Sequence, residues 1–280
     1  MEYLALAVLC SVGIATIIKY AGIKGYPSFV LFATNYLVAT IGALIGSGGK
    51  VAPFSDPPLL LLTVFLGGLF IWCFWILMMA VKKLGMVLPV TLMRISAVIP
   101  TLASIVLFGE APMLMQIIGI ALAFIALPLA ARGPVTKDDI QTLFGSGFGW
   151  GLVLFFSYGL TDFMFKLQKE HFPVGNLYEV LVVIFGTAFV IGTVTMLVRK
   201  EKISAPVLLS GVLLGILNMF AAYFFMSAIA VLPGVVVFPA NGIGVILLST
   251  VVGVLLWKEK LAVRNYIALA LAVTALLFLS

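Results

Sequence analysis

Residues 205–217 read APVLLSGVLLGIL, a run that carries no charge and is apolar on every side of a helix. A transmembrane β-strand would instead alternate apolar and polar residues over about ten positions. Similar runs recur along the 280 residues, of which 64% are hydrophobic and 9% are charged. Because a soluble domain carries about 25% charged residues, the sequence predicts an all-α integral membrane protein.

Ten transmembrane helices are expected, because a span takes about 20 residues and Gly, Pro and Lys cluster at nine breaks between apolar segments. With ten spans no extramembrane domain fits in the chain. The predicted spans are approximately 2–20, 28–46, 59–81, 86–108, 113–131, 147–167, 176–198, 206–230, 233–256 and 261–280.

The two halves of the chain resemble each other at an offset of 149 residues. Gly85 then matches Gly234 and Glu110 matches Glu259, while the many matches among Ala, Leu and Val carry little weight. We therefore expect a five-helix repeat in residues 1–132, a linker in 133–146 and a second repeat in 147–280. An odd number of spans per repeat inverts the second one, which places a transporter's substrate site near the midplane between the halves.

Basic residues concentrate in alternate connections and predict the orientation. Those after odd-numbered spans hold eleven Lys or Arg residues, and those after even-numbered spans hold two. The eleven are Lys24, Lys82, Lys83, Arg132, Lys137, Arg199, Lys200, Lys202, Lys258, Lys260 and Arg264; the two are Lys50 and Lys169. Because cytoplasmic loops carry such an excess, both termini are expected outside. The net charge of +6 thus reflects orientation and predicts no nucleic-acid partner.

Ionisable residues inside a span are functional candidates, because lipid makes them costly. Asp162 lies in the sixth span with Lys166 one turn later. The two side chains either form a structural ion pair, with Lys166 reaching the membrane boundary, or face a substrate or ion. Arg94 lies between Pro89 and Pro100 in the fourth span. These prolines loosen the helix, so Arg94 is expected to face the interior of the bundle.

Five further residues complete the predicted substrate-binding set. Asn241 lies in the stretch Pro-Ala-Asn-Gly of the ninth span and binds either a ligand or a neighbouring helix. Lys19 ends the first span and either contacts substrate or extends to the boundary. Asn218 and Tyr223 of the eighth span are weaker candidates. Trp72 stacks on a ligand or makes packing or lipid contacts.

No catalytic, metal or cofactor motif is recognised in the sequence, so the chain is not expected to be an enzyme. His171 has no companions for a metal site. Cys10 and Cys73 are expected to be buried, unreactive thiols. Glu110 and Glu259 follow the fourth and ninth spans, where they are expected to accept hydrogen bonds at helix ends.

The chain resembles EamA-type members of the drug/metabolite transporter superfamily. The similarity rests on Gly13–Lys19, on Phe108-Gly109-Glu110 after Pro100, on Gly119 and on Trp257-Lys258-Glu259. It implies transport of small metabolites or drugs through a central cavity lined by spans one, three, four, six, eight and nine. It also implies cytoplasmic termini, contrary to the loop charges, and the deep Asp162 is not part of the general family pattern.

We therefore expect a secondary transporter in the plasma (inner) membrane that works by alternating access. Arg94, Lys19 and Lys166 outnumber Asp162, which favours anionic or zwitterionic small-molecule substrates. Membrane lipids surround the protein, and a proton or counter-substrate is a possible coupling partner, with Asp162 as the protonation site. The alternatives are a non-transporting membrane receptor or partner protein, and an intramembrane enzyme acting on a lipid-linked substrate. The sequence leaves open whether the protein is a monomer or a homodimer.

Overall fold

The computed structural model describes residues 1–84, 87–130, 148–258 and 261–279, and these residues form helices and short connections without a β-strand. The helices follow the predicted spans closely. Their bounds are α1 Glu2–Ile23, α2 Ser28–Gly46, the 3-10 helix η1 Ala52–Ser55, α3 Pro57–Leu84, α4 Val87–Ile95, α5 Val98–Val106, α6 Leu114–Leu129, α8 Phe148–His171, α9 Leu177–Val198, α10 Ala205–Val231, α11 Gly234–Trp257 and α12 Val263–Leu279.

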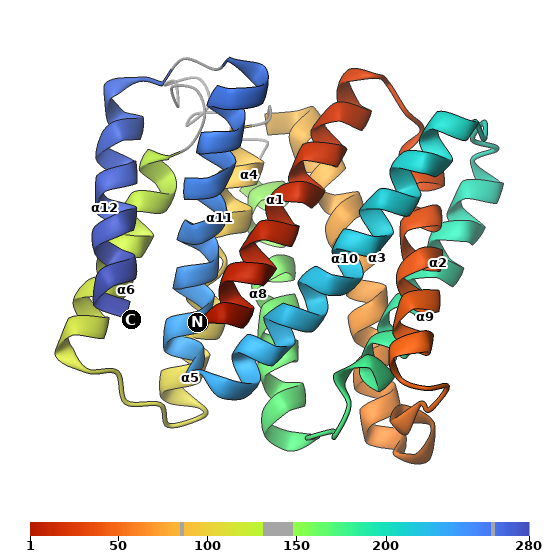
Figure 1. Ribbon diagram of the computed structural model, residues 1–280, viewed down its shortest axis with the longest axis horizontal. Helices are drawn as coiled ribbons and strands as arrows, with labels where there is room; N and C mark the ends of the chain where they lie inside the picture. Colours follow the sequence, from red (N-terminus) through yellow and green to blue (C-terminus); the bar gives the residue numbers. More distant parts are fainter. Residues whose placement is uncertain (85–86, 131–147, 259–260, 280) are drawn as a thin grey trace. The chain divides into compact units, whose positions relative to one another are not determined.

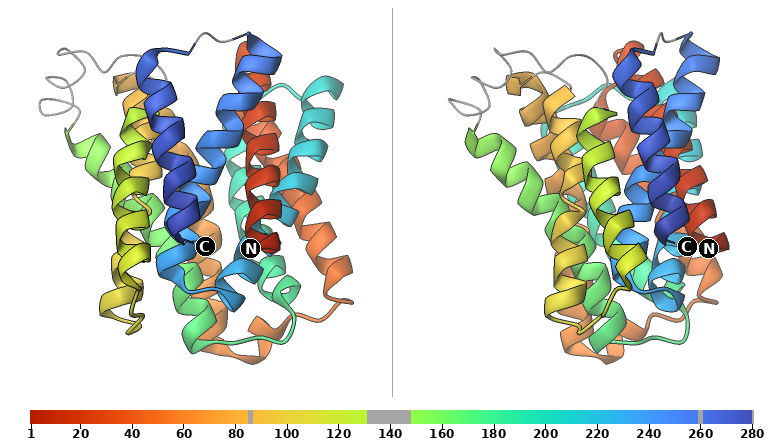
Figure 2. Two further views of the ribbon diagram at one scale, coloured as in Figure 1. Left: turned by 60° about the vertical axis from the view of Figure 1, so that its left-hand side comes forward. Right: turned by 90° about the vertical axis from the view of Figure 1, so that its left-hand side faces the viewer.

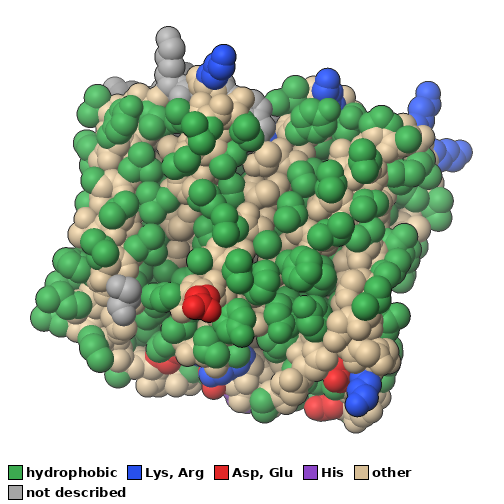
Figure 3. All heavy atoms as spheres, viewed as in Figure 1, with side chains coloured by type: hydrophobic (Ala, Val, Ile, Leu, Met, Phe, Trp, Pro, Cys, Tyr) green, Lys and Arg blue, Asp and Glu red, His purple; other side chains and the backbone are tan. Residues whose placement is uncertain are grey.

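The chain is a multi-pass integral membrane protein. Eight stretches of the described helices are long and apolar enough to cross a membrane, with α4 and α5 counted together as Leu88–Val106. The apolar helices α6 and α12 are shorter. Large hydrophobic side chains such as Ile45, Val106 and Val263 are at least three-quarters exposed, and hydrophobic side chains cover most of the face shown in Figure 3. Such a surface is suited to lipid and not to water.

The contacts divide the chain into two compact units. Unit 1 comprises Trp72–Lys166, Val231–Ser280 and Met1, and unit 2 comprises Glu2–Ile71 and Leu167–Ala230. Each unit therefore draws helices from both of the sequence halves, and α3 and α8 contribute to both units. This division by contacts differs from the division into sequence repeats, which stays a prediction.

In unit 1, α11 packs against α5, α6 and α12, and α6 also packs against α12 and α4. Figures 1 and 2 show α6 and α12 running side by side. Their close approach depends on Gly119 of α6, where an added Cβ would lie 3.1 Å from the backbone oxygen of Ala275. Small residues are used in this way between membrane helices.

In unit 2, α2 packs against α9, and α10 contacts α2 through Gly211 and Gly215. A Cβ at Gly215 would lie 2.5 Å from the backbone oxygen of Asn35, and one at Gly211 would lie 2.6 Å from Thr34. This GxxxG pair therefore forms a helix–helix contact, as its spacing indicates. Gly147, from another such pair, lies outside the described residues.

The predicted fourth span, 86–108, is divided into α4 and α5. Pro100 has no N–H to donate to the Ser96 carbonyl, which instead accepts the Ile99 N–H at 2.9 Å. The Ser96 hydroxyl donates to the Met93 carbonyl at 2.6 Å. Proline and this side-chain hydrogen bond interrupt the regular helical bonding, so the break lies directly after Arg94 and Ile95.

Candidate functional site

One face of α8 points into the interior of unit 1. It is marked by residues four apart, which share a helix face. Leu154 is fully buried with Ile76 and Ala80 of α3, and Trp150, Tyr158 and Leu92 of α4 pack against this core. Asp162 and Lys166 continue the same row of four-residue steps. The packing of α8 on α3 and α4 therefore places Asp162 on the inner face.

Arg94 and Asp162 both belong to unit 1, on helices that contribute to the packing around Leu154. Arg94 is in the last turn of α4 and Asp162 is in α8, and both side chains are partly buried. Neither forms a direct hydrogen bond or ion pair with a residue that the structure describes. Two oppositely charged side chains are therefore partly buried on helices of the same unit.

Two neighbours complete the surroundings of this pair. Tyr158 lies one turn before Asp162 on α8, and Cys73 belongs to α3, which packs against α8. The Cys73 sulfur lies 3.3 Å from the Thr161 hydroxyl, which itself donates to the Ser157 carbonyl at 2.9 Å. Thr161 therefore links α3 to α8 next to the candidate carboxylate.

Trp72 also links α3 to α8. Its indole Nε1–H donates to the Ser157 hydroxyl at 2.9 Å, and its ring lies 5.2 Å from that of Trp75, which lies 6.3 Å from Trp150. The Trp72 side chain is 42% exposed. These contacts belong to helix packing, and the stacking of Trp72 on a ligand stays a prediction.

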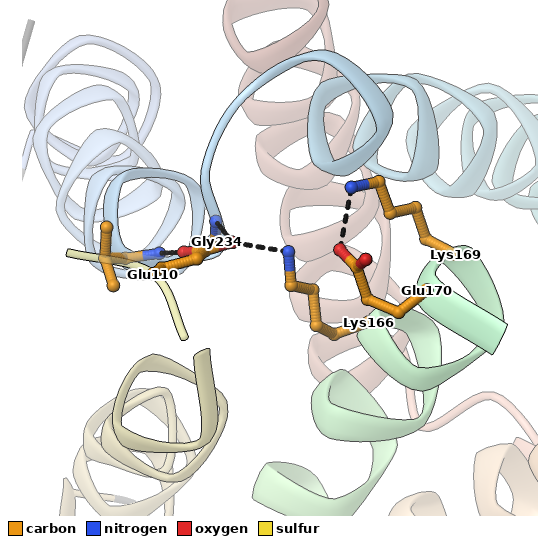
Figure 4. Close-up of polar contacts among 6 residues, drawn as sticks. Glu110, Lys166, Lys169, Glu170 and Gly234 are labelled. Carbon is orange, nitrogen blue, oxygen red and sulfur yellow. Dashed lines mark hydrogen bonds and ion pairs between the residues drawn. The ribbon is translucent and has the colours of Figure 1, made fainter. Parts of the chain in front are cut away.

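Of the two alternatives for Asp162 and Lys166, the structural ion pair between them is not observed among the described contacts. The Lys166 ammonium instead lies 2.5 Å from Oε1 of Glu110, and the two side chains are 1% and 16% exposed. Glu110 also accepts the N–H groups of Gly234 and Val235, each at 2.9 Å. Figure 4 shows Glu110 between Gly234 and Lys166.

Local structure explains this change of partner. The first N–H groups of a helix have no intrahelical acceptor, and Glu110 provides one for α11. A buried carboxylate needs a counter-charge, which Lys166 supplies from α8. Glu110 thus accepts hydrogen bonds at a helix end, as predicted, whereas its repeat counterpart Glu259 lies outside the described residues.

Asn241 is in α11, two residues after Pro239. Its Oδ1 atom is buried and accepts no hydrogen bond within the structure described. A buried acceptor without a donor is costly, so a ligand that donates an N–H or O–H there would satisfy it. The bond from Oδ1 to a neighbouring helix, which was the alternative prediction, is not observed.

The remaining three candidates belong to unit 2. Asn218 Nδ2 donates to Asn35 Oδ1 at 3.2 Å, and the Tyr223 ring stacks on that of Tyr178 at 4.3 Å with 9° between the planes. Both residues therefore take part in contacts between helices. Lys19 is partly exposed in α1.

Two glutamates of unit 2 were not singled out from the sequence. Glu201 accepts the N–H groups of Phe29 and Val30 at 2.9 and 3.1 Å, at the start of α2. Glu179 accepts the N–H of Ala52 at 2.9 Å, at the start of η1. The available signal differed between the two: Glu201 stands among the basic residues Arg199, Lys200 and Lys202, whereas Glu179 lies in the first turn of α9. An acid in a connection or at a helix start is suited to accept bonds at a nearby helix N-terminus.

The described residues bring no three His, Cys, Asp or Glu side chains together as a metal site. Cys10 and Cys73 are free thiols, partly buried and buried respectively. His171 ends α8.

Comparisons with known proteins support the fold and name no function. No family model matches the chain. An uncharacterized protein of Haemophilus influenzae is 28% identical over 294 aligned positions, which cover 99% of this chain and 96% of that protein. A crystal structure matches 99% of this chain and 94% of its own with a TM-score of 0.79 and 15% identity. That similarity shows a shared fold alone.

Proposed function

We propose that this chain is a secondary transporter that moves a small anionic or zwitterionic solute across the membrane by alternating access. The proposal includes the ten-span arrangement as two inverted five-helix repeats and membership of the drug/metabolite transporter superfamily. It assigns the chain no chemical step. The observation that carries it is that two oppositely charged side chains, Arg94 and Asp162, are partly buried on membrane-spanning helices of one unit and form no hydrogen bond or ion pair with a described residue.

Energetic cost is the reason that this pair supports transport. A charged side chain inside a membrane span costs several kcal/mol unless it is paired or hydrated. Lys166 and Glu110 avoid this cost by direct contact at 2.5 Å, whereas Arg94 and Asp162 do not. Arg94 offers up to five N–H donors, so an anionic group of a substrate would compensate its charge.

The broken helix gives Arg94 a way to move. Secondary transporters commonly bind substrate at discontinuous helices near the membrane midplane. Arg94 lies in the last turn of α4, immediately before the irregular residues Ser96 and Ala97. A change in this connection would move the guanidinium relative to α8 and alternate the access to it.

Location and coupling follow from the same proposal. A plasma-membrane carrier without an ATP-binding motif must use an ion gradient, a counter-substrate or the membrane potential for uphill transport. The loop charges place the termini outside, and the family resemblance places them in the cytoplasm. We propose the orientation that the charges favour.

Uptake into proteoliposomes tests the proposal. Purified full-length protein is assayed against a panel of small anionic and zwitterionic metabolites, with and without a pH gradient. We expect flux of at least one class in wild type, loss in Arg94→Gln, and partial retention in Arg94→Lys. The control Lys169→Gln removes a cation from an exposed pair with Glu170 and is expected to transport like wild type. A folded wild-type protein that carries no member of the panel, or equal flux in Arg94→Gln, would refute the proposal.

A further inference from the structure

We propose that the connection between α9 and α10 binds the headgroup of an anionic phospholipid. The site comprises Arg199, Lys200 and Lys202, with Lys24 contributed by the neighbouring connection between α1 and α2. All four side chains are exposed, and none forms an ion pair with a residue that the structure describes. The inference concerns unit 2 alone and does not depend on the proposed transport.

Two contacts join this connection to the start of α2. Glu201 Oε2 accepts the N–H groups of Phe29 and Val30 at 2.9 and 3.1 Å. The Arg199 guanidinium lies over the Phe29 ring, 4.7 Å from its centre, which is an attractive cation–π contact. The connection is thus anchored to α2 through the residues on both sides of Lys200.

The backbone of the connection is fixed as well. Lys200 has a positive φ of 51°, the left-handed conformation in which many helices end. Three N–H groups of the connection donate to carbonyls in the last turn of α9, namely those of Arg199, Lys200 and Glu201 to Thr195, Leu197 and Met196 at 3.0, 3.1 and 3.3 Å. The three cations are therefore presented from an ordered backbone.

The charge at this end of unit 2 is unbalanced. Residues 20–30 and 197–205 contain four basic residues and one acidic residue. The carboxylate of that acidic residue, Glu201, is turned to the first N–H groups of α2, where a negative charge is favoured. Within the described residues it forms no ion pair with the neighbouring cations. The partner that fits the remaining positive charge is an anion.

Apolar and aromatic side chains place these cations at the membrane boundary. Leu197 and Val198 precede the connection and Ile203 follows it, and each of the three is more than half exposed. At the end of α1, the Tyr20 ring lies 6.2 Å from the Tyr26 ring. Tyrosine is enriched at the level of lipid headgroups, and basic clusters beside a membrane helix attract anionic lipids. A molecule with an anionic headgroup and hydrocarbon chains therefore fits both parts of this surface.

Native mass spectrometry of the full-length protein in a neutral detergent tests the inference. Phosphatidylglycerol is compared with phosphatidylcholine that has the same acyl chains, and the affinity of the first bound lipid is measured. Because each basic residue near a membrane surface strengthens the attraction about fivefold, we expect wild type to bind phosphatidylglycerol about tenfold more tightly or better.

Matched triple variants locate the site. Arg199→Gln/Lys200→Gln/Lys202→Gln should lose the preference for phosphatidylglycerol and keep its affinity for phosphatidylcholine. The control Lys50→Gln/Lys83→Gln/Lys258→Gln removes three exposed lysines from other connections and should bind both lipids like wild type. If the first variant fails to fold, Lys200→Gln/Lys202→Gln, which leaves Arg199 on Phe29, decides the outcome.

A soluble competitor distinguishes a lipid from a dissolved anion. Glycerol 3-phosphate carries the phosphate without acyl chains, so it should not displace phosphatidylglycerol at ten times the lipid concentration. Displacement would assign the cations to a soluble anion and overturn the inference. So would equal binding of the two lipids by wild type, or an unchanged preference in the first variant. Loss of the preference in the control would also overturn it, because the attraction would then be spread over all basic connections. Each of these results is independent of flux, which tests the proposed function.

Discussion

Breaking the contact between Glu110 and Lys166 is expected to destabilise unit 1 strongly. Glu110 neutralises a lysine that is 1% exposed and accepts two N–H groups at the start of α11. Removing one partner of a buried ion pair costs about 3–5 kcal/mol, because the buried charge of the other loses compensation. For a chain of this size, this corresponds to a fall in melting temperature of about 6–20 °C. Thermal unfolding of Glu110→Gln in detergent or nanodiscs measures the effect.

A double-mutant cycle with Lys166→Met separates the ion pair from the hydrogen bonds to α11. Lys166→Met removes the buried cation, so Glu110→Gln should cost less in its presence than in wild type. We expect a coupling energy of about 1–3 kcal/mol. The control Lys169→Met breaks an exposed pair, with side chains 35% and 29% exposed, and should cost at most about 1 kcal/mol. Additive effects of the two buried substitutions, or a cost as small as that of the control, would refute this account of the contact.

Three further perturbations test other parts of the structure. Gly215→Leu should lower the melting temperature, because a Cβ at this position would lie 2.5 Å from a backbone oxygen of α2. The control Gly68→Ala should leave the melting temperature unchanged, because a Cβ at Gly68 would have no atom within 4 Å. Trp72→Phe removes the hydrogen bond to α8, which should cost about 1 kcal/mol and leave the flux unchanged; lost flux at unchanged stability would instead place Trp72 at the substrate. The loop charges also predict which cysteines a membrane-impermeant maleimide can reach in a chain without its native cysteines. Lys200→Cys, in a cytoplasmic connection, should be labelled only after the cells are opened. Lys50→Cys, in an outside connection, should be labelled in intact cells. The opposite pattern would place the termini in the cytoplasm.

Helix positions were predictable from the sequence because lipid requires long apolar segments and the breaks carry turn residues. The second predicted span, 28–46, coincides with α2, which is Ser28–Gly46. The fourth predicted span, 86–108, is not one helix but two, α4 and α5. Its prolines had indicated a loosened backbone. Residues on both sides of Ser96 and Ala97 are mainly apolar, so the exact break depended on hydrogen bonds that composition does not encode.

The partners of the charged residues were less predictable. Within one helix, the sequence offers Lys166 two acidic neighbours four residues away, Asp162 before it and Glu170 after it. Its observed partner, Glu110, is 56 residues away, and such a contact follows from packing between helices. The four-residue steps from Trp150 through Leu154 and Tyr158 to Asp162 mark the inner face of α8, and this pattern was readable in advance. The packing of α4 against that face was not, because it depends on where α4 ends.

The contact of Glu110 with Gly234 also explains where the repeat signal is strongest. In an apolar environment, Ala, Leu and Val replace one another at modest cost, so a duplication between two such segments leaves little trace. A carboxylate at a helix N-terminus has no such freedom, since its loss leaves backbone N–H groups without an acceptor in lipid. Gly234 is constrained too, because a Cβ there would collide with the buried Ser104 side chain. Glu110 and Gly234 come from different predicted halves, and the Gly234 N–H donates to the Glu110 carboxylate. Glutamate and glycine are also the residue types whose matches carry most weight at the offset of 149. Both types therefore have a physical role at this helix end.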